Sequence, residues 1–176
     1  MTMKKRKETL LLFLDIDGVL NTEKTFNTNY RLLGRNLDVF AALLTKLDKA
    51  GYLTRVILSS TWRYGYETSY EACSVTVQRL IRELGKRDIG IAGKTVYYPK
   101  ATRDREIMRY IREYGREHVG FKHLTLDDDL TIFSGEGAKN VNLYLVNSAT
   151  GLTEGDIPKI LKQIKDIDKY RENGIN

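Results

Sequence analysis

Short apolar segments separated by amphipathic ones are the feature that most limits how this chain can fold. The first segment, Leu10–Leu14, is five apolar residues without interruption, and further strand-like segments lie within residues 52–60, 121–129 and 141–146. A strand with one face in water alternates polar and apolar residues, so an unbroken run indicates a strand covered on both faces. Alternation of such strands with helices predicts an α/β fold, a three-layer Rossmann-like sandwich around a mainly parallel sheet.

The segments between the strands have helical spacing of apolar residues. Residues 36–51 predict an amphipathic helix with Asn36 as its cap and Gly51 at its end. A short strand or extended loop is expected over residues 88–98. The sequence has no linker, repeat or low-complexity tract, which predicts one domain over residues 1–176. Further helices are expected up to Leu84, over residues 100–115, and within residues 152–173, starting or interrupted near Pro158.

The charge and cysteine content limit the class of protein. The formal net charge is +6, from 29 Lys and Arg against 23 Asp and Glu, which favours polyanionic partners such as nucleic acids, nucleotides or phosphorylated compounds. A single cysteine, Cys73, excludes an internal disulfide. Neither a signal peptide nor an apolar run long enough to span a bilayer is recognised, so we expect a cytoplasmic protein with no membrane partner.

Polar residues follow three of the predicted strands. Asp15 and Asp17 follow the first, Ser59 and Ser60 end the second, and three aspartates at 127–129 end the third. The carboxyl ends of parallel strands meet at one edge of the sheet, where α/β proteins bind their ligands. Neighbouring buried carboxylates repel one another, so the pattern predicts a cation at this edge.

These residues resemble the motifs of the haloacid dehalogenase (HAD) superfamily of phosphotransfer enzymes. "FLDIDGVL", "VILSST" and "LTLDDD" are similar to its first, second and fourth motifs, and the third is a Lys or Arg near the start of the preceding helix. The resemblance covers roughly residues 11–152. The segments "SSTWR", "RDREI", "LDDD" and "GLT" most resemble the small HAD phosphatase domain that accompanies RNA-repair proteins.

The resemblance implies a role for each residue of the first motif. Asp15 would be the nucleophile that forms an aspartyl-phosphate. Asp17 would protonate the leaving oxygen and then activate the hydrolytic water. Gly18 would allow a tight turn and a close approach of the substrate to the backbone.

The second and third motifs would contact the phosphoryl group. Ser59 would donate a hydrogen bond to a phosphoryl oxygen. Arg103 or Lys100 would offset the negative charge on Asp15 and on the reacting phosphate, and the sequence leaves the choice between them open.

The implied cofactor is Mg²⁺. Its expected ligands are the carboxylate of Asp15, the backbone carbonyl of Asp17, and Asp128, with water completing the octahedron. Asp127 and Asp129 compete for the supporting role, and the sequence leaves the choice between them open.

The spacing of the motifs also bears on the substrate. Only residues 21–35 separate the first strand from its helix, too few for a separate cap domain, so we expect an open site for bulky or polymeric substrates. The aromatic loop that follows Ser59 is expected to rim this site and to stack bases, unless its rings pack on the neighbouring helix. The predicted substrate-binding residues of this region are Ser60, Trp62, Arg63 and Tyr64, with Tyr66 also expected at the rim.

The sequence favours a Mg²⁺-dependent phosphomonoester hydrolase that acts on DNA or RNA ends. A phosphatase of small molecules, nucleotides first, is the alternative, and a HAD-like binding module without catalysis is a third hypothesis. The sequence does not indicate the oligomeric state.

Overall fold

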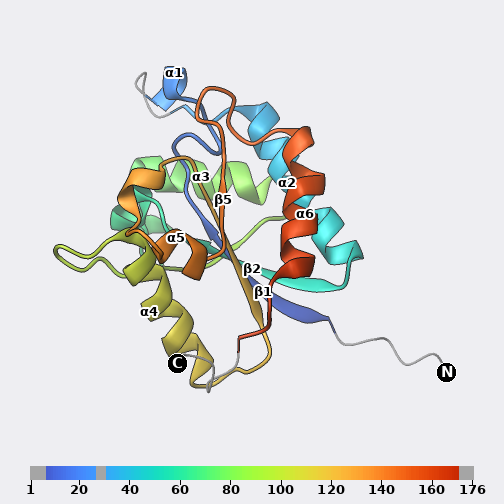
Figure 1. Cartoon of the computed structure of the whole chain (residues 1–176). Coiled ribbons are helices and arrows are strands. Elements are labelled where there is room, and N and C mark those ends of the chain that lie inside the picture. The colour runs from blue at the N-terminus through green and yellow to red at the C-terminus, as the bar shows by residue number, and fades with distance from the viewer. Residues whose placement is uncertain (1–6, 27–30, 171–176) are drawn as a thin grey trace.

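The computed structural model describes residues 7–26 and 31–170 of the chain (Figure 1). Within them five strands form one sheet in the order β3-β2-β1-β4-β5, and every neighbouring pair is parallel. The predicted α/β architecture with a parallel central sheet is therefore confirmed. The strands are β1 (Glu8–Leu14), β2 (Tyr52–Leu58), β3 (Ile91–Lys94), β4 (Lys122–Asp127) and β5 (Leu143–Leu145).

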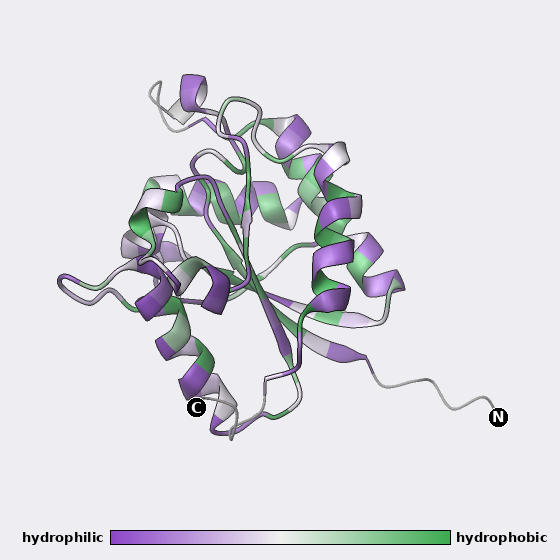
Figure 2. Ribbon diagram, in the orientation of Figure 1, coloured by the Kyte–Doolittle hydropathy of each residue, from purple (hydrophilic) through white to green (hydrophobic). Residues whose placement is uncertain are grey.

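Helices cover both faces of the sheet and give the three layers. Apolar residues of α2, α3 and α6 pack in one core, and those of α4 and α5 pack in a second core on the other face. Figure 2 shows hydrophobic and hydrophilic bands alternating along α2 and α6, as expected for helices with one buried face. None of the described helices has the length and apolar character to span a membrane. The helices are α1 (Glu23–Phe26), α2 (Gly34–Lys49), α3 (Val75–Gly85), α4 (Arg103–Gly115), α5 (Gly137–Asn140) and α6 (Ile157–Asp166).

The position of β1 in the middle of the sheet explains its unbroken apolar run. Leu10, Leu12 and Leu14 face the core formed with α2, α3 and α6, while Leu11 and Phe13 face the core formed with α4. Because successive strand residues point to opposite faces, a strand covered on both sides needs apolar residues at every position.

Every residue of strand β4 is buried although four of its six residues are polar or charged. The Lys122 amine donates to the carbonyl of Ile164 (2.8 Å), at the end of α6. The Thr125 hydroxyl donates to the carbonyl of Val141 (3.0 Å), and His123 Nε2 lies 3.1 Å from the carbonyl oxygen of Asn140. Backbone acceptors of neighbouring elements thus satisfy side chains that look unsuited to a core strand.

Two expected helix starts need correction. Helix α2 begins at Gly34, and Asn36 is not its cap: the Asn36 amide is buried and donates to the carbonyls of Thr150 (3.0 Å) and Leu152 (2.8 Å). This contact ties α2 to the loop before α6. Helix α4 begins at Arg103 rather than at residue 100.

Two expected helix boundaries agree with the structure. Gly51 follows α2 with a φ of +95°, in the left-handed region that favours glycine, and β2 begins at the next residue. Pro158 lies in the first turn of α6, where its missing N–H has no intrahelical partner to lose.

Candidate active site

The carboxyl ends of β1, β2 and β4 bring three polar residues to one edge of the sheet. The Asp15 N–H donates to the carbonyl of Leu126 (2.9 Å), and the Ser59 N–H donates to the carbonyl of Leu14 (3.0 Å). These bonds extend the strand ladder by one step on each side of β1. Asp15, Ser59 and Asp127 are all buried at this edge.

Three carboxyl groups form an acidic cluster at this edge: Asp15, Asp127 and Asp128 each offer an oxygen, and these atoms lie within 4.8 Å of one another. Gly18 has a φ of +74°, and a Cβ built on it would lie 2.1 Å from Asp128 Oδ2. A glycine is therefore required both by the backbone conformation and by the approach of this loop to Asp128.

The electrostatics of the acidic cluster call for a cation. Burial, followed by the charge of Asp127, raises the pKa of Asp15 well above its usual value, against the lowering effect of Arg103. Burial also raises the pKa of Asp127 to about 6, while Arg103 opposes that rise. Asp127 Oδ2 is buried without a hydrogen bond. Clustered carboxylate oxygens are ligands that Mg²⁺ prefers, so the residues present fit a divalent cation.

Among the described residues, Arg103, the first residue of α4, is the cation whose side chain contacts this cluster. Its Nη1 lies 3.2 Å from Asp15 Oδ1 and 3.6 Å from Asp127 Oδ2, and it also donates to the carbonyl of Ser59. Lys100 lies exposed in the preceding loop with a φ of +65°. Of the two residues considered for the third motif, the one beside Asp15 is Arg103.

Asp17 lies beside the cluster with its carboxylate held from two sides. The Asn21 amide donates to Oδ1 and the Trp62 indole N–H donates to Oδ2, both at 2.9 Å. The Gly18 N–H in turn donates to Asn21 Oδ1 (2.8 Å). The turn after β1 is therefore a small network that sets the direction of the Asp17 side chain.

The sequence predicted Trp62 and Arg63 at the rim of the site, but both side chains lie beneath it. Trp62 is only 6% exposed and Arg63 only 4%. Arg63 Nη1 donates to the carbonyls of Ser59 (2.8 Å) and Ser60 (3.1 Å), and its Nη2 lies 2.8 Å from Glu106 Oε2. Their polar groups can be buried because groups at this edge of the sheet and on α4 offer them polar partners.

The remaining predicted residues divide between the interior and the surface. Ser60 is buried, and its hydroxyl accepts from the Trp62 N–H (3.3 Å) as the cap of the 3₁₀ turn Thr61–Gly65. The Ser59 hydroxyl is buried without a hydrogen bond, so it is available to a bound oxygen. Tyr64 is exposed at the surface.

Sequence reasoning missed two residues of the layer that supports the site. Glu106 pairs with Arg63 and accepts from the Tyr98 N–H (3.2 Å), and Asn21 orients Asp17. Acidic residues are common in the first turn of a helix, so Glu106 gave no signal of its own. Its position three residues after Arg103, on the same face of α4, is the one indication that the sequence contains.

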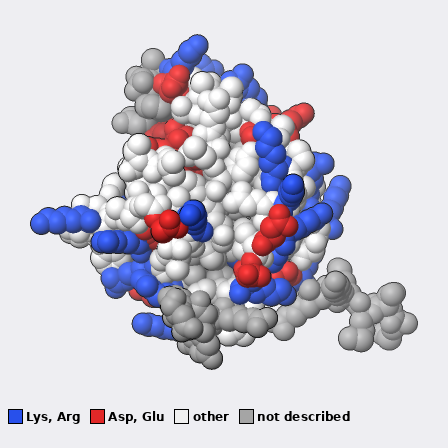
Figure 3. Space-filling view, viewed as in Figure 1, with Lys and Arg blue, Asp and Glu red and all other residues white. Residues whose placement is uncertain are grey.

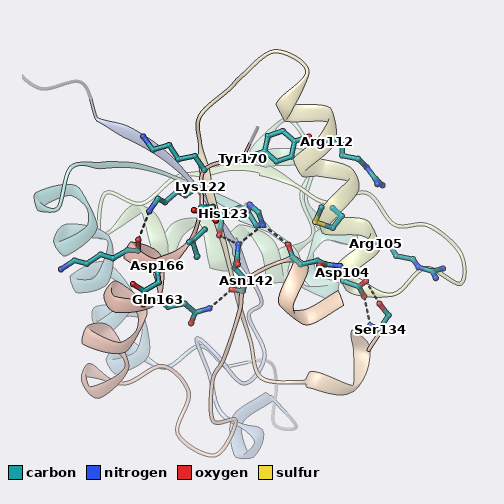
Figure 4. A pocket seen from close by; sticks show the side chains of 16 residues that line it. Asp104, Arg105, Arg112, Lys122, His123, Ser134, Asn142, Gln163, Asp166 and Tyr170 are labelled. Atoms are coloured by element: carbon teal, nitrogen blue, oxygen red, sulfur yellow. Dashed lines mark hydrogen bonds between the residues drawn. The ribbon is translucent and has the colours of Figure 1, made fainter. Parts of the chain in front are cut away.

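A large pocket of about 1590 Å³ lies elsewhere, between α4, α5 and the end of α6 (Figure 4). Its lining includes Arg105, Arg112, Gln163 and Asp166, and the Lys122 amine within it already donates to two carbonyls of α6. It contains no member of the acidic cluster. The groups suited to phosphate chemistry are at the sheet edge instead.

The strand order, an Asp-x-Asp turn after the central strand, a serine after β2 and paired acids after β4 together define a HAD-like fold. Comparison with known families agrees. The chain belongs to the family described as "HAD domain in Swiss Army Knife RNA repair proteins", whose model matches residues 11–157. No curated protein matches the chain. HAD domains are generally hydrolases, chiefly phosphatases, and typically use Mg²⁺.

Proposed function

We propose that this protein is a Mg²⁺-dependent phosphomonoester hydrolase that removes terminal phosphates from nucleic acids through an aspartyl-phosphate. The single observation that carries the proposal is the position of Asp15, buried between the Arg103 guanidinium and the other two carboxyl groups of the acidic cluster. A carboxylate in contact with one cation and with a site for a second can approach a phosphate dianion, since the cations offset the charge repulsion.

In the proposed reaction an Asp15 carboxylate oxygen attacks phosphorus, and the bond from phosphorus to the ester oxygen breaks. Asp17 gives its proton to that leaving oxygen, which departs as an alcohol. Asp17 then takes a proton from water as the water attacks the aspartyl-phosphate, which releases phosphate and restores Asp15. The Asn21 and Trp62 hydrogen bonds hold Asp17 in one direction for both steps. Each carboxylate oxygen has two acceptor sites, so one stays available for the transferred proton.

The Arg103 guanidinium and the Ser59 hydroxyl would bind phosphoryl oxygens. Arg103 already contacts Asp15, and the Ser59 hydroxyl is buried without another partner. Asp15, Asp127 and Asp128, with the backbone carbonyl of Asp17, would hold Mg²⁺, which when bound offsets charge on the transferring group.

The choice of nucleic-acid ends as substrate has three supports. The net charge is +6. The segment between β1 and α2, residues 15–33, is too short to contain a cap domain that would restrict access. The family is described by its occurrence in RNA repair proteins.

Phosphate release is the direct test. Wild-type protein, Asp15→Asn and the surface control Asp168→Asn would be assayed with Mg²⁺ on p-nitrophenyl phosphate, nucleotides, and 3′- and 5′-phosphorylated oligonucleotides. We expect activity in the wild type and the control, loss in Asp15→Asn, and loss on addition of EDTA.

Two results would contradict parts of the proposal. Equally low rates for wild type and Asp15→Asn would reject the aspartyl-phosphate mechanism and favour a binding module. A much higher kcat/KM for mononucleotides than for oligonucleotides would assign the protein to small-molecule substrates.

A further inference from the structure

Two exposed tyrosines from different loops meet on the surface beside the candidate active site. Tyr64 belongs to the 3₁₀ turn after β2 and Tyr97 to the loop after β3, and their exposed fractions are 56% and 51%. Their ring centroids are 5.5 Å apart with an interplanar angle of 76°, the edge-to-face arrangement that aromatic pairs prefer. Neither ring is needed to fill a core, so the pair presents aromatic surface to the solvent.

Both loops leave the sheet edge that contains Asp15. The turn with Tyr64 begins directly after Ser59 and Ser60. On the β3 side, the Thr95 N–H donates to the carbonyl of Leu58, the last residue of β2, two residues before Tyr97. The tyrosine pair therefore borders the candidate active site on its β3 side.

The buried ion pair of Arg63 and Glu106 fixes the two loops relative to each other. Arg63 immediately precedes Tyr64, and its guanidinium lies 5.0 Å from the Tyr64 ring centroid. Glu106 Oε1 accepts from the N–H of Tyr98, the residue after Tyr97. One side chain of α4 thus holds both loops, so the aromatic surface exists before any ligand binds.

The surface around the pair is positively charged. Lys100 is exposed on the loop between Tyr97 and α4, and the Arg109 guanidinium of α4 lies 3.9 Å from the ring centroid of Tyr98, the residue after Tyr97. Arg109 is paired with the half-exposed Glu113 (2.9 Å), while the two acids in the first turn of α4, Asp104 and Glu106, are buried and do not offset the charge at the surface. Figure 3 shows Lys and Arg side chains gathered on the side of the molecule formed by this loop and α4.

We propose that Tyr64 and Tyr97 are a stacking platform for a nucleobase of a single-stranded polynucleotide. Every base has a π face that can stack on an aromatic ring, and the backbone phosphates match the surrounding cations. The platform rests on the proposed function in one respect: it places the base next to a terminal phosphate in the active site. A peptide of Asp and Glu would use the cations but has no aromatic ring to stack on the tyrosines.

The test uses the double variant Tyr64→Ser/Tyr97→Ser and the matched control Tyr70→Ser, which removes another exposed tyrosine. Binding of a fluorescently labelled single-stranded oligonucleotide is measured by anisotropy, and hydrolysis is measured on a phosphorylated oligonucleotide and on p-nitrophenyl phosphate. We expect the double variant to bind the oligonucleotide about tenfold more weakly and to hydrolyse the phosphorylated oligonucleotide with a kcat/KM about tenfold lower. Its hydrolysis of p-nitrophenyl phosphate should be unchanged, and Tyr70→Ser should behave as the wild type in every assay.

The outcomes separate the platform from the proposed function. Equal oligonucleotide binding by wild type and the double variant overturns the platform, whether or not the protein is a phosphatase. If the double variant loses oligonucleotide binding while the wild-type protein hydrolyses no phosphate ester, the platform is supported and the proposed function is rejected. If labelled polyglutamate binds and its binding needs the tyrosines while oligonucleotides do not bind, the surface is a protein contact and the platform is rejected.

Discussion

Removal of Glu106 should destabilise the protein far more than removal of an exposed acid from the same helix. Arg63 and Glu106 form an ion pair at 2.8 Å in which both side chains are almost fully buried. Burial, followed by the charge of Arg103, lowers the pKa of Arg63, and Glu106 opposes this. Without Glu106, two guanidinium groups would face the Ser59 carbonyl with one carboxylate fewer.

The magnitude follows from the burial of the pair. Breaking a buried pair by removing one partner costs about 3–5 kcal/mol, because an uncompensated charge remains in the interior. The exposed pair of Arg109 and Glu113, at 2.9 Å on the same helix, is half exposed on both sides and should contribute less than about 1 kcal/mol. We therefore expect Glu106→Ala to lower the free energy of unfolding by about 3–5 kcal/mol and Glu113→Ala by less than about 1 kcal/mol.

Urea unfolding followed by tryptophan fluorescence is a suitable assay, because Trp62 is the single tryptophan and lies buried next to Arg63 in the sequence. Circular dichroism on the same samples checks that unfolding is a two-state process. The cycle is completed by Arg63→Ala and the double variant, whose loss should be smaller than the sum of the two single losses. Additive losses, or a Glu106→Ala loss no larger than that of Glu113→Ala, would refute the ion pair as the element that holds the site together.

Three further predictions concern the turn after β1 and helix α4. Trp62→Phe keeps a ring but removes the hydrogen bond to Asp17, so kcat should fall about tenfold at unchanged KM in steady-state assays. Gly18→Ala, at a φ of +74°, should cost about 1–3 kcal/mol in urea unfolding and abolish activity, since the new methyl group would displace the acidic cluster. Burial raises the pKa of Asp104, but hydrogen bonds, chiefly from Ser134, lower that pKa below its usual value of 3.8. These hydrogen bonds therefore stabilise the fold above pH 3.8, and the stabilisation is lost as the pH falls through the lowered pKa. The loss of stability caused by Ser134→Ala should accordingly be smaller in unfolding measurements at acid pH than at neutral pH.

Much of the site's position could be predicted from the sequence because it depends on local patterns. Uninterrupted apolar residues indicated a buried β1, and parallel strands necessarily carry Asp15, Ser59 and Asp127 to one edge. The contact of Arg103 with Asp15 needed only that a helix begin near the same edge.

The burial of Trp62 and Arg63 could not be predicted in this way. A loop rich in polar and aromatic residues looks exposed, and the partner that makes burial of Arg63 favourable, Glu106, is 43 residues away along the chain. The polar residues of β4 are a similar case, since their acceptors are backbone carbonyls of α6 and of the segment around α5. Such contacts depend on tertiary structure, which local composition does not encode.

The open edge of the site leads to one more expectation. Enzymes with lids use closure to orient a substrate and exclude water, but no cap domain lies among the described residues of this chain. Binding energy from the substrate's own base would have to perform this orientation, and energy used in that way raises kcat as well as affinity. Across p-nitrophenyl phosphate, a mononucleotide and a short phosphorylated oligonucleotide, kcat should therefore rise with length, and the rise should be lost in Tyr64→Ser/Tyr97→Ser. A series in which KM alone changes would mean that the base adds affinity without orienting the phosphate towards Asp15.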